Sequence, residues 1–302
     1  MKLRFIASLC ASLALTAVAG VAQAAANPGG VAYSQTTNVS LYGKATGLIV
    51  AGRCNRNSSV FQTNRSKGGE VLVYITPAAV PDNFICSLDQ QTYMNNYGAV
   101  PLWPFPSYGQ RIMRPGNHMA DLRAGSKWSN YLVSFVEKLM RERKFDGVFI
   151  DTCGGRPWSS YSNWVNWPKS ERDAWTNGCV DLVRRIDAKR RAINPKFIVV
   201  NNNVWDRTDK STIGLAAHKY IDGVALEHPA APSVATYHRA YAAKTFSNLG
   251  HRRVFVIARS VDDARAWANQ KGVTHVSSQA KGTNYYAYPT VPPVGFRDLN
   301  DR

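Results

Sequence analysis

Short apolar runs alternate along the chain with longer amphipathic segments. The apolar runs are almost uniformly hydrophobic, as in strands that are buried on both faces of a parallel sheet. This pattern predicts eight strands, over residues 46–52, 70–77, 98–105, 146–151, 196–203, 221–227, 252–259 and 273–279.

The segments between these runs have the spacing of amphipathic helices. In residues 128–144, five apolar side chains recur at intervals of three and four and form one face: Leu132, Phe135, Val136, Leu139 and Met140. A second helix is predicted over 171–193, where Asn194-Pro195 ends it. Two further helices, over 233–250 and 262–272, each end at a glycine.

Eight strands that alternate with helices predict a single (β/α)8 TIM barrel over residues 46–302, with an irregular tail after Lys281. The alternative is an open, doubly wound sheet. That fold is disfavoured because no glycine-rich phosphate loop follows the first predicted strand. No shift in composition divides the chain, so we expect one domain.

The first 24 residues have the features of a Sec-type signal peptide. Lys2 and Arg4 precede an apolar segment, and Ala22-Gln23-Ala24 fits a cleavage site. We therefore expect a secreted or periplasmic protein; a membrane anchor is the weaker alternative because the cleavage site follows directly. Residues 25–45 are rich in glycine, serine and threonine and predict a loose N-terminal arm. No later segment is long and apolar enough to span a membrane.

The chain is strongly basic, with 37 Lys and Arg against 20 Asp and Glu, a formal charge of +17. Loss of Lys2 and Arg4 with the signal segment would leave +15. A basic exported protein suggests an anionic partner, such as an acidic polysaccharide, although charge alone can also serve solubility. The basic residues are spread over helix faces, so no nucleic-acid partner is predicted. We expect a monomer.

Four cysteines follow the signal segment, an even number that favours two disulfides in an oxidising compartment. Three pairings are possible, and we prefer Cys54–Cys86 and Cys153–Cys179 because each pair follows neighbouring strand ends. A zinc site is disfavoured by the absence of close Cys and His spacing. The histidines show no ligand motif either, and the sequence predicts no metal and no cofactor.

One short pattern occurs twice: Asp-Gly-Val, two apolar residues and a carboxylate. It ends in Asp151 and in Glu227, at the ends of the predicted fourth and sixth strands. Alternate strands of a barrel share interior layers, so both acids are expected on one side of its C-terminal mouth. Asp146 and Asp222 begin the repeats and are expected to cap or turn the opposite end.

Two carboxylates that face a cleft are the minimum equipment for glycoside hydrolysis. Asp151 would be the nucleophile or base, and Glu227 the general acid. The alternatives are a metal pair, a carboxylate paired with an arginine, and a non-catalytic glycan-binding TIM barrel. A metal-dependent hydrolase would need more ligands than the strand ends supply.

Other polar and aromatic residues near the strand ends are candidates for sugar contact, although such residues also satisfy buried backbone groups at a barrel rim. These candidates are Arg53, Tyr74, Trp103, Trp158, Asn201, Asn203, Arg259 and Gln279. Among them the strand-end positions of Asn201 and Arg259 are favoured. The aromatic loop 156–168 suits stacking on sugars, or a small satellite core held by a disulfide at Cys153.

The segment NHMADLRAGSKWSNYLVSFVEKLMRERKFDGVFIDTCGG resembles a block of glycoside hydrolase family 114, the endo-α-1,4-polygalactosaminidases, and of related hypothetical TIM-barrel glycosidases. The resemblance implies an endo-acting hydrolase of a polysaccharide, with an acid after the fourth strand and a glutamate after the sixth. Those positions fall on Asp151 and Glu227. The segments VYITPAAV and Thr152-Cys153-Gly-Gly depart from the pattern, and the basic charge disfavours a polycationic galactosamine polymer as substrate.

Overall fold

The computed structural model describes the barrel strands, several surrounding helices and the segments next to them. The described residues are 29–34, 48–51, 59–66, 69–81, 93, 96–104, 112–114, 117–153, 166–202, 217–227, 253–258, 260–268, 273 and 275–278. The predicted signal peptide, the predicted helix over 233–250 and the tail after Lys281 lie outside these residues.

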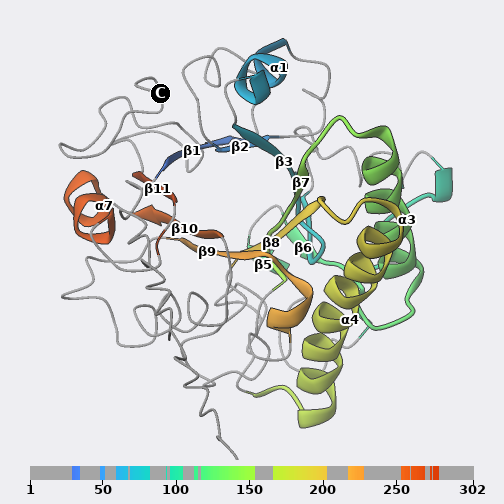
Figure 1. Cartoon of the computed structure of the whole chain (residues 1–302). Helices are drawn as coiled ribbons and strands as arrows, with labels where there is room; N and C mark the ends of the chain where they lie inside the picture. The colour runs from blue at the N-terminus through green and yellow to red at the C-terminus, as the bar shows by residue number, and fades with distance from the viewer. Residues whose placement is uncertain are drawn as a thin grey trace, which may run out of the picture.

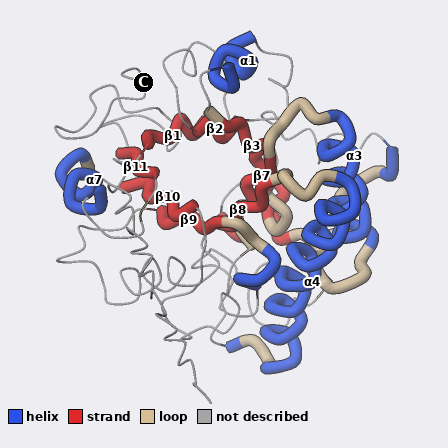
Figure 2. The backbone as a smooth tube through the Cα atoms, viewed as in Figure 1, coloured by secondary structure: helices blue, strands red, loops and turns tan. Residues whose placement is uncertain are grey.

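Eight parallel strands are hydrogen-bonded in the closed order β1-β11-β10-β9-β8-β7-β3-β2 (Figure 1). Figure 2 shows them as a ring with helices outside it. Their bounds are β1 Gly29–Ser34, β2 Leu48–Ala51, β3 Glu70–Ile75, β7 Gly147–Ile150, β8 Ile198–Asn202, β9 Gly223–Glu227, β10 Arg253–Ala258 and β11 His275–Ser278. The prediction of an α/β fold around a parallel sheet is confirmed.

Two sequence-based predictions differ from this arrangement. The predicted loose arm, 25–45, contains β1, which pairs with both β2 and β11 and closes the ring. The predicted strand 98–105 is not in the barrel; its pairing is an isolated antiparallel bridge between Leu102 and Ala120. Pro101 and Pro104 lack the backbone N–H that a central strand needs. The two errors compensate, so β7 and β9 remain the fourth and sixth barrel strands.

The barrel separates two apolar clusters. The inner cluster fills the barrel with residues that alternate along the strands: Val50, Leu72, Tyr74, Phe149, Ile198, Val200, Ala225, Phe255 and Ile257. The intervening strand residues belong to the outer cluster, which packs against the helices. Because side chains alternate between faces, membership of these clusters shows which strand positions point inward.

The helices cover the outside of the ring (Figure 1). Their bounds are α1 Ser59–Ser66, α3 Lys127–Glu142, α4 Lys169–Ile193, the 3-10 helix η5 His218–Tyr220 and α7 Val261–Ala268. The predicted apolar face of α3 is buried, and Ser126 caps its first turn by accepting the N–H of Ser129 at 3.1 Å. None of the described helices combines the length and the apolarity that crossing a bilayer requires.

A small antiparallel sheet follows β3, in the order β4-β6-β5. Its strands are β4 Ala79–Pro81, β5 Ile112–Arg114 and β6 Asn117–Met119. The Trp128 indole N–H of α3 donates to the Pro77 carbonyl at 2.7 Å, which fixes the turn between β3 and β4.

Asp146 and Asp222, the first residues of the two repeats, join neighbouring strands at the N-terminal end of the barrel. The Asp146 carboxylate accepts the Val71 N–H of β3 at 2.8 Å, and the Asp222 carboxylate accepts the Val199 N–H of β8 at 2.8 Å. Each aspartate also donates its own N–H to the carbonyl of the same valine, at 2.8 and 2.7 Å. The predicted structural role of these two acids is confirmed.

The glycines of the repeats face the strand on the other side. A Cβ on Gly147 would lie less than 3.0 Å from the Ile198 carbonyl of β8, and one on Gly223 equally close to the Arg253 carbonyl of β10. Each Asp-Gly unit therefore binds one neighbouring strand and leaves room for the next. This explains why the chain uses the same unit before both β7 and β9.

An ion pair crosses the N-terminal end of the barrel, which is called its lower end below. Glu70 and Arg253 are the first residues of β3 and β10, strands that lie opposite each other in the ring. Arg253 Nε lies 2.8 Å from Glu70 Oε2, and a second guanidinium nitrogen contacts Oε1. Both positions have the inward parity of Leu72 and Phe255, so the pair closes the end opposite the two predicted catalytic acids.

Candidate active site

Asp151 follows β7 directly and is fixed by hydrogen bonds through both its backbone and its carboxylate. Its N–H donates to the Ile75 carbonyl of β3 at 2.9 Å. Its Oδ1 accepts the Asn202 Nδ2–H at 2.8 Å and the Thr152 N–H at 2.7 Å. Its Oδ2 accepts the Tyr74 hydroxyl. Three donors on one carboxylate stabilise its ionised form and fix its orientation.

Tyr74 approaches Asp151 from the neighbouring strand. It lies in β3, in register with Phe149 of β7, and the two rings stack with centroids 6.1 Å apart. The side chain belongs to the inner cluster and is 8% exposed. Tyr74 was predicted to contact sugar; the structure instead brings its hydroxyl to the candidate catalytic carboxylate.

Asn202 is the residue that the sequence reasoning missed. It ends β8, the strand between β7 and β9, and is fully buried. Its Nδ2 binds Asp151, while its Oδ1 is buried and has no hydrogen-bond partner among the described residues. Asn202 lies two residues after Val200 of the inner cluster, so its position on β8 is an inward one, which the sequence alone does not reveal.

Asn201, the predicted sugar ligand, has the opposite parity. It is 1% exposed and pairs in register with Ile150, which belongs to the outer cluster. Its side chain therefore faces away from the barrel interior, and the predicted sugar contact at this position is wrong. Asn203 lies outside the described residues.

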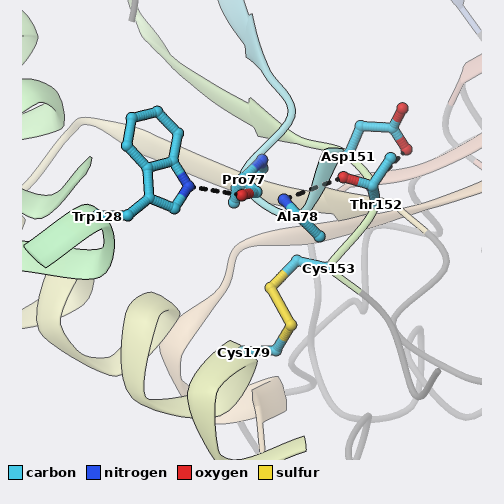
Figure 3. Close-up of a disulfide and its surroundings, with 7 residues drawn as sticks. All are labelled: Pro77, Ala78, Trp128, Asp151, Thr152, Cys153 and Cys179. Carbon is cyan, nitrogen blue, oxygen red and sulfur yellow. Dashed lines mark hydrogen bonds between the residues drawn. A yellow bond between two sulfur atoms is a disulfide. The ribbon is translucent and has the colours of Figure 1, made fainter. Parts of the chain in front are cut away.

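The chain after Asp151 is held on both sides (Figure 3). Thr152 has a left-handed backbone, with φ 59°, and its Oγ1 accepts the Ala78 N–H at 3.3 Å. Cys153 is buried and forms a disulfide with Cys179 of α4, with a Cα–Cα distance of 5.5 Å. The predicted Cys153–Cys179 pair is confirmed, whereas Cys54 and Cys86 lie outside the described residues.

Trp103 was predicted to contact sugar, but in the structure it is a core residue. Its side chain is fully buried against Trp167 and Trp175, with ring centroids 5.9 and 5.4 Å away. The prediction failed because residues 98–105 do not form a barrel strand, so Trp103 does not end one at the mouth. Trp167, which ends the aromatic loop, belongs to this cluster, as expected for a satellite core.

Glu227 is the last residue of β9, in register with Ile257 of β10. It comes two residues after Ala225 of the inner cluster, so its position along the strand is an inward one. The structure thus places the backbone of Glu227 on the second strand from Asp151, with β8 and Asn202 between them. The remaining predicted site residues lie outside the described residues: Arg53, Trp158, Arg259 and Gln279.

Within the described part of the chain, no three His, Cys, Asp or Glu side chains gather in an arrangement that would hold a metal ion. The chemistry of the site as described is that of one anchored carboxylate with a tyrosine, an amide and a backbone N–H around it.

No protein-family profile matches the sequence, and no curated protein matches it. Solved structures do match its fold. The glycoside hydrolase domain of PelA from Pseudomonas aeruginosa superposes with a TM-score of 0.50 and 13% identity, over 83% of this chain and 100% of that one. Aspergillus fumigatus Ega3, in complex with galactosamine, gives a TM-score of 0.50 and 12% identity, over 83% and 90%. The resemblance to such glycosidases is confirmed at the level of the fold.

Proposed function

We propose that this protein is a polysaccharide-cleaving glycoside hydrolase built on a complete (β/α)8 barrel. The observation that carries the proposal is the anchored carboxylate of Asp151 at the C-terminal end of the fourth strand. In barrel enzymes, catalytic residues come from the C-terminal ends of several strands. The fold shared with two glycosidase structures supports the reaction class.

In this proposal, Asp151 is the ionised partner of a two-carboxylate mechanism. A carboxylate that accepts bonds from Tyr74, Asn202 and the Thr152 N–H stays charged, as a nucleophile or base must. Glu227 is the general acid that protonates the leaving oxygen. The backbones of β7 and β9 are two strand spacings apart, about 10 Å. In this proposal both acids point inward, so their carboxylates lie closer together than the backbones, on the two sides of a glycosidic bond.

We propose an anionic polysaccharide as the substrate. Without Lys2 and Arg4 of the signal segment, the exported chain would carry a formal charge of +15, which attracts a polyanion and repels a polycation. This choice differs from the galactosamine bound to Ega3, and low sequence identity leaves room for a different glycan. An excess of positive charge predicts that cleavage of an anionic polymer weakens as salt rises.

The proposal includes export and action as a monomeric endo-hydrolase. Residues 1–24 would be removed as a signal peptide, and the Cys153–Cys179 disulfide fits an oxidising compartment. Mass spectrometry of the exported protein would give the cleavage site. Light scattering would give the oligomeric state, and the length distribution of early products distinguishes endo from exo cleavage.

The test is reducing-end release from uronic-acid, galactosamine-containing and neutral polymers. Wild type is compared with Asp151→Asn, Glu227→Gln and Asp222→Asn. Asp222 is the control, because it begins the repeat that ends in Glu227 and is bonded to β8 at the opposite end of the barrel. We expect the first two variants to lose at least about 1000-fold in kcat and the third to retain it when folded. Activity that survives both substitutions contradicts the site. Binding of a polymer with no release by wild type would favour the glycan-binding barrel instead.

A further inference from the structure

Thr152 adopts a backbone conformation that a β-branched residue seldom takes. Its φ of 59° lies in the left-handed region, which is costly for a residue with a branched Cβ. The Thr152 N–H lies in the peptide plane that joins it to Asp151, and it donates to Asp151 Oδ1 at 2.7 Å. Strain of this kind persists where the surrounding structure holds the residue in place.

Two contacts from different elements hold it. On one side, the Ala78 N–H, from the turn after β3, donates to Thr152 Oγ1 at 3.3 Å. On the other, the next residue, Cys153, is covalently bonded to Cys179 in α4 and is fully buried. Figure 3 shows both attachments on either side of the short chain segment that leaves β7.

From this geometry we propose that Thr152 is a positioning residue, and that the Cys153–Cys179 disulfide completes the clasp that orients the Asp151 carboxylate. The inference rests on the proposed role of Asp151 and adds a redox dependence to it. With the disulfide intact, α4 fixes the backbone at residue 153, and Thr152 stays in its left-handed conformation. Reduction by a dithiol, which supplies two electrons and two protons and is itself oxidised to a disulfide, gives two thiols. The freed backbone then lets the peptide plane between Asp151 and Thr152 rotate, so the N–H donor leaves Oδ1.

The first experiment compares variants of Thr152. Thr152→Ser keeps the hydroxyl acceptor for Ala78, whereas Thr152→Val keeps the shape and loses it. We expect Thr152→Val to lower kcat about 10- to 100-fold with little change in KM, as displacement of a reacting group does. We expect Thr152→Ser to restore most of kcat. Equal losses of kcat in Thr152→Val and Thr152→Ser would overturn the role of the hydroxyl.

The second experiment compares Cys153→Ser/Cys179→Ser with Leu182→Ala. Leu182 is fully buried one turn after Cys179, so its truncation loosens α4 while the disulfide remains. Both variants should lower the Tm, but only the cysteine variant should lower kcat with little change in KM. Equal effects on kcat would reduce the disulfide to general stabilisation and overturn the proposal.

Amide hydrogen exchange of residues 150–153 provides a readout that needs no substrate. The Thr152 amide should exchange faster in the cysteine double variant and in reduced wild type than in Leu182→Ala. Unchanged protection of that amide would overturn the clasp even if the enzyme is active. Faster exchange in a protein that cleaves no glycan would uphold the clasp and contradict only the proposed function.

Discussion

The groups that donate hydrogen bonds to the Asp151 carboxylate come from separate parts of the chain, and no single motif contains them. Tyr74 comes from β3, Asn202 from β8 and the Thr152 N–H from the residue that follows. Together these donors restrict the side-chain torsions of the carboxylate and favour its charged form. The site is therefore organised around one acid before any substrate is bound.

Asn202→Ala tests this organisation. Loss of a hydrogen bond to a charged group costs about 1.5–3 kcal/mol, which corresponds to roughly a 10- to 100-fold loss in kcat/KM. Without this donor the Asp151 carboxylate is no longer held in one orientation, so kcat should fall with little change in KM.

The matched control for that variant is Asn201→Ala, the adjacent and equally buried asparagine with outward parity. It should lower stability and leave kcat unchanged below the Tm. If the two variants lower kcat alike, Asn202 does not act through Asp151.

The same pair of residues shows where sequence reasoning succeeded and failed. The position of Asp151 was predictable because an apolar strand ends in an acid. Which of the three consecutive asparagines point into the barrel depends on the residue at which β8 is taken to begin. An error of one residue exchanges the inward and outward positions of the strand. The bonds of Asp151 to Tyr74 and Asn202 depend on which strands are neighbours, which no local pattern reveals.

At the scale of the elements, the Asp-Gly units set the distances between strands. Gly147→Ala would drive a methyl group into the Ile198 backbone of β8, where no flexible side chain can yield. We expect a loss of about 3 kcal/mol or more in the free energy of unfolding, at the upper end for overpacked sites.

Urea unfolding measures this loss, with Gly125→Ala as the control. Gly125 has φ +79° and open space around its Cα, so its substitution costs only backbone strain, about 1–2 kcal/mol. A smaller loss for Gly147→Ala than for Gly125→Ala would show that β7 and β8 can move apart.

The α3–α4 contact includes an acid whose charge contributes to stability. The Lys189 ammonium of α4 and the Arg141 guanidinium each lie 2.7 Å from the Glu137 carboxylate. Hydrogen bonds from Lys189 first, and then from Arg141, lower the pKa of Glu137. The stabilisation is present above the unfolded pKa of about 4.3 and is lost as the pH falls through the folded value.

Glu137→Gln should therefore be less stable than wild type at pH 7, by no more than about 1 kcal/mol because the pair is partly exposed. The difference should shrink as acid protonates Glu137 in the wild type. Urea titrations at pH 7 and at acidic pH measure it, with Lys138→Gln, the adjacent exposed residue, as the control. A difference that stays constant with pH would mean that lost packing, and not charge, is responsible.

The long helices were predictable as elements, whereas β1 was not. Helix α3 repeats its apolar spacing over four turns, so its face is evident without tertiary context. Strand β1 is the six-residue GGVAYS, whose pairing comes from β2 and β11. Short strands of this kind are stabilised by their neighbours more than by their own sequence.

At the scale of the whole molecule, the two ends of the barrel carry different kinds of residues. The lower end is held by Asp146, Asp222 and the Glu70–Arg253 ion pair, all bonded to strands or to each other. The upper end carries Asp151 and the strand position of Glu227. In barrel enzymes the C-terminal face carries the active site, and the N-terminal face contributes to stability.

The most direct measurement compares Asp151→Asn with Asp146→Asn on the glycan that wild type cleaves. Both acids belong to one repeat and flank one strand, but Asp146 accepts the Val71 N–H at the opposite end. We predict that Asp151→Asn abolishes reducing-end release while folding normally. We predict that Asp146→Asn lowers the Tm and keeps the wild-type kcat below it. If Asp151→Asn retains wild-type release, the account of this carboxylate as the catalytic nucleophile or base is contradicted.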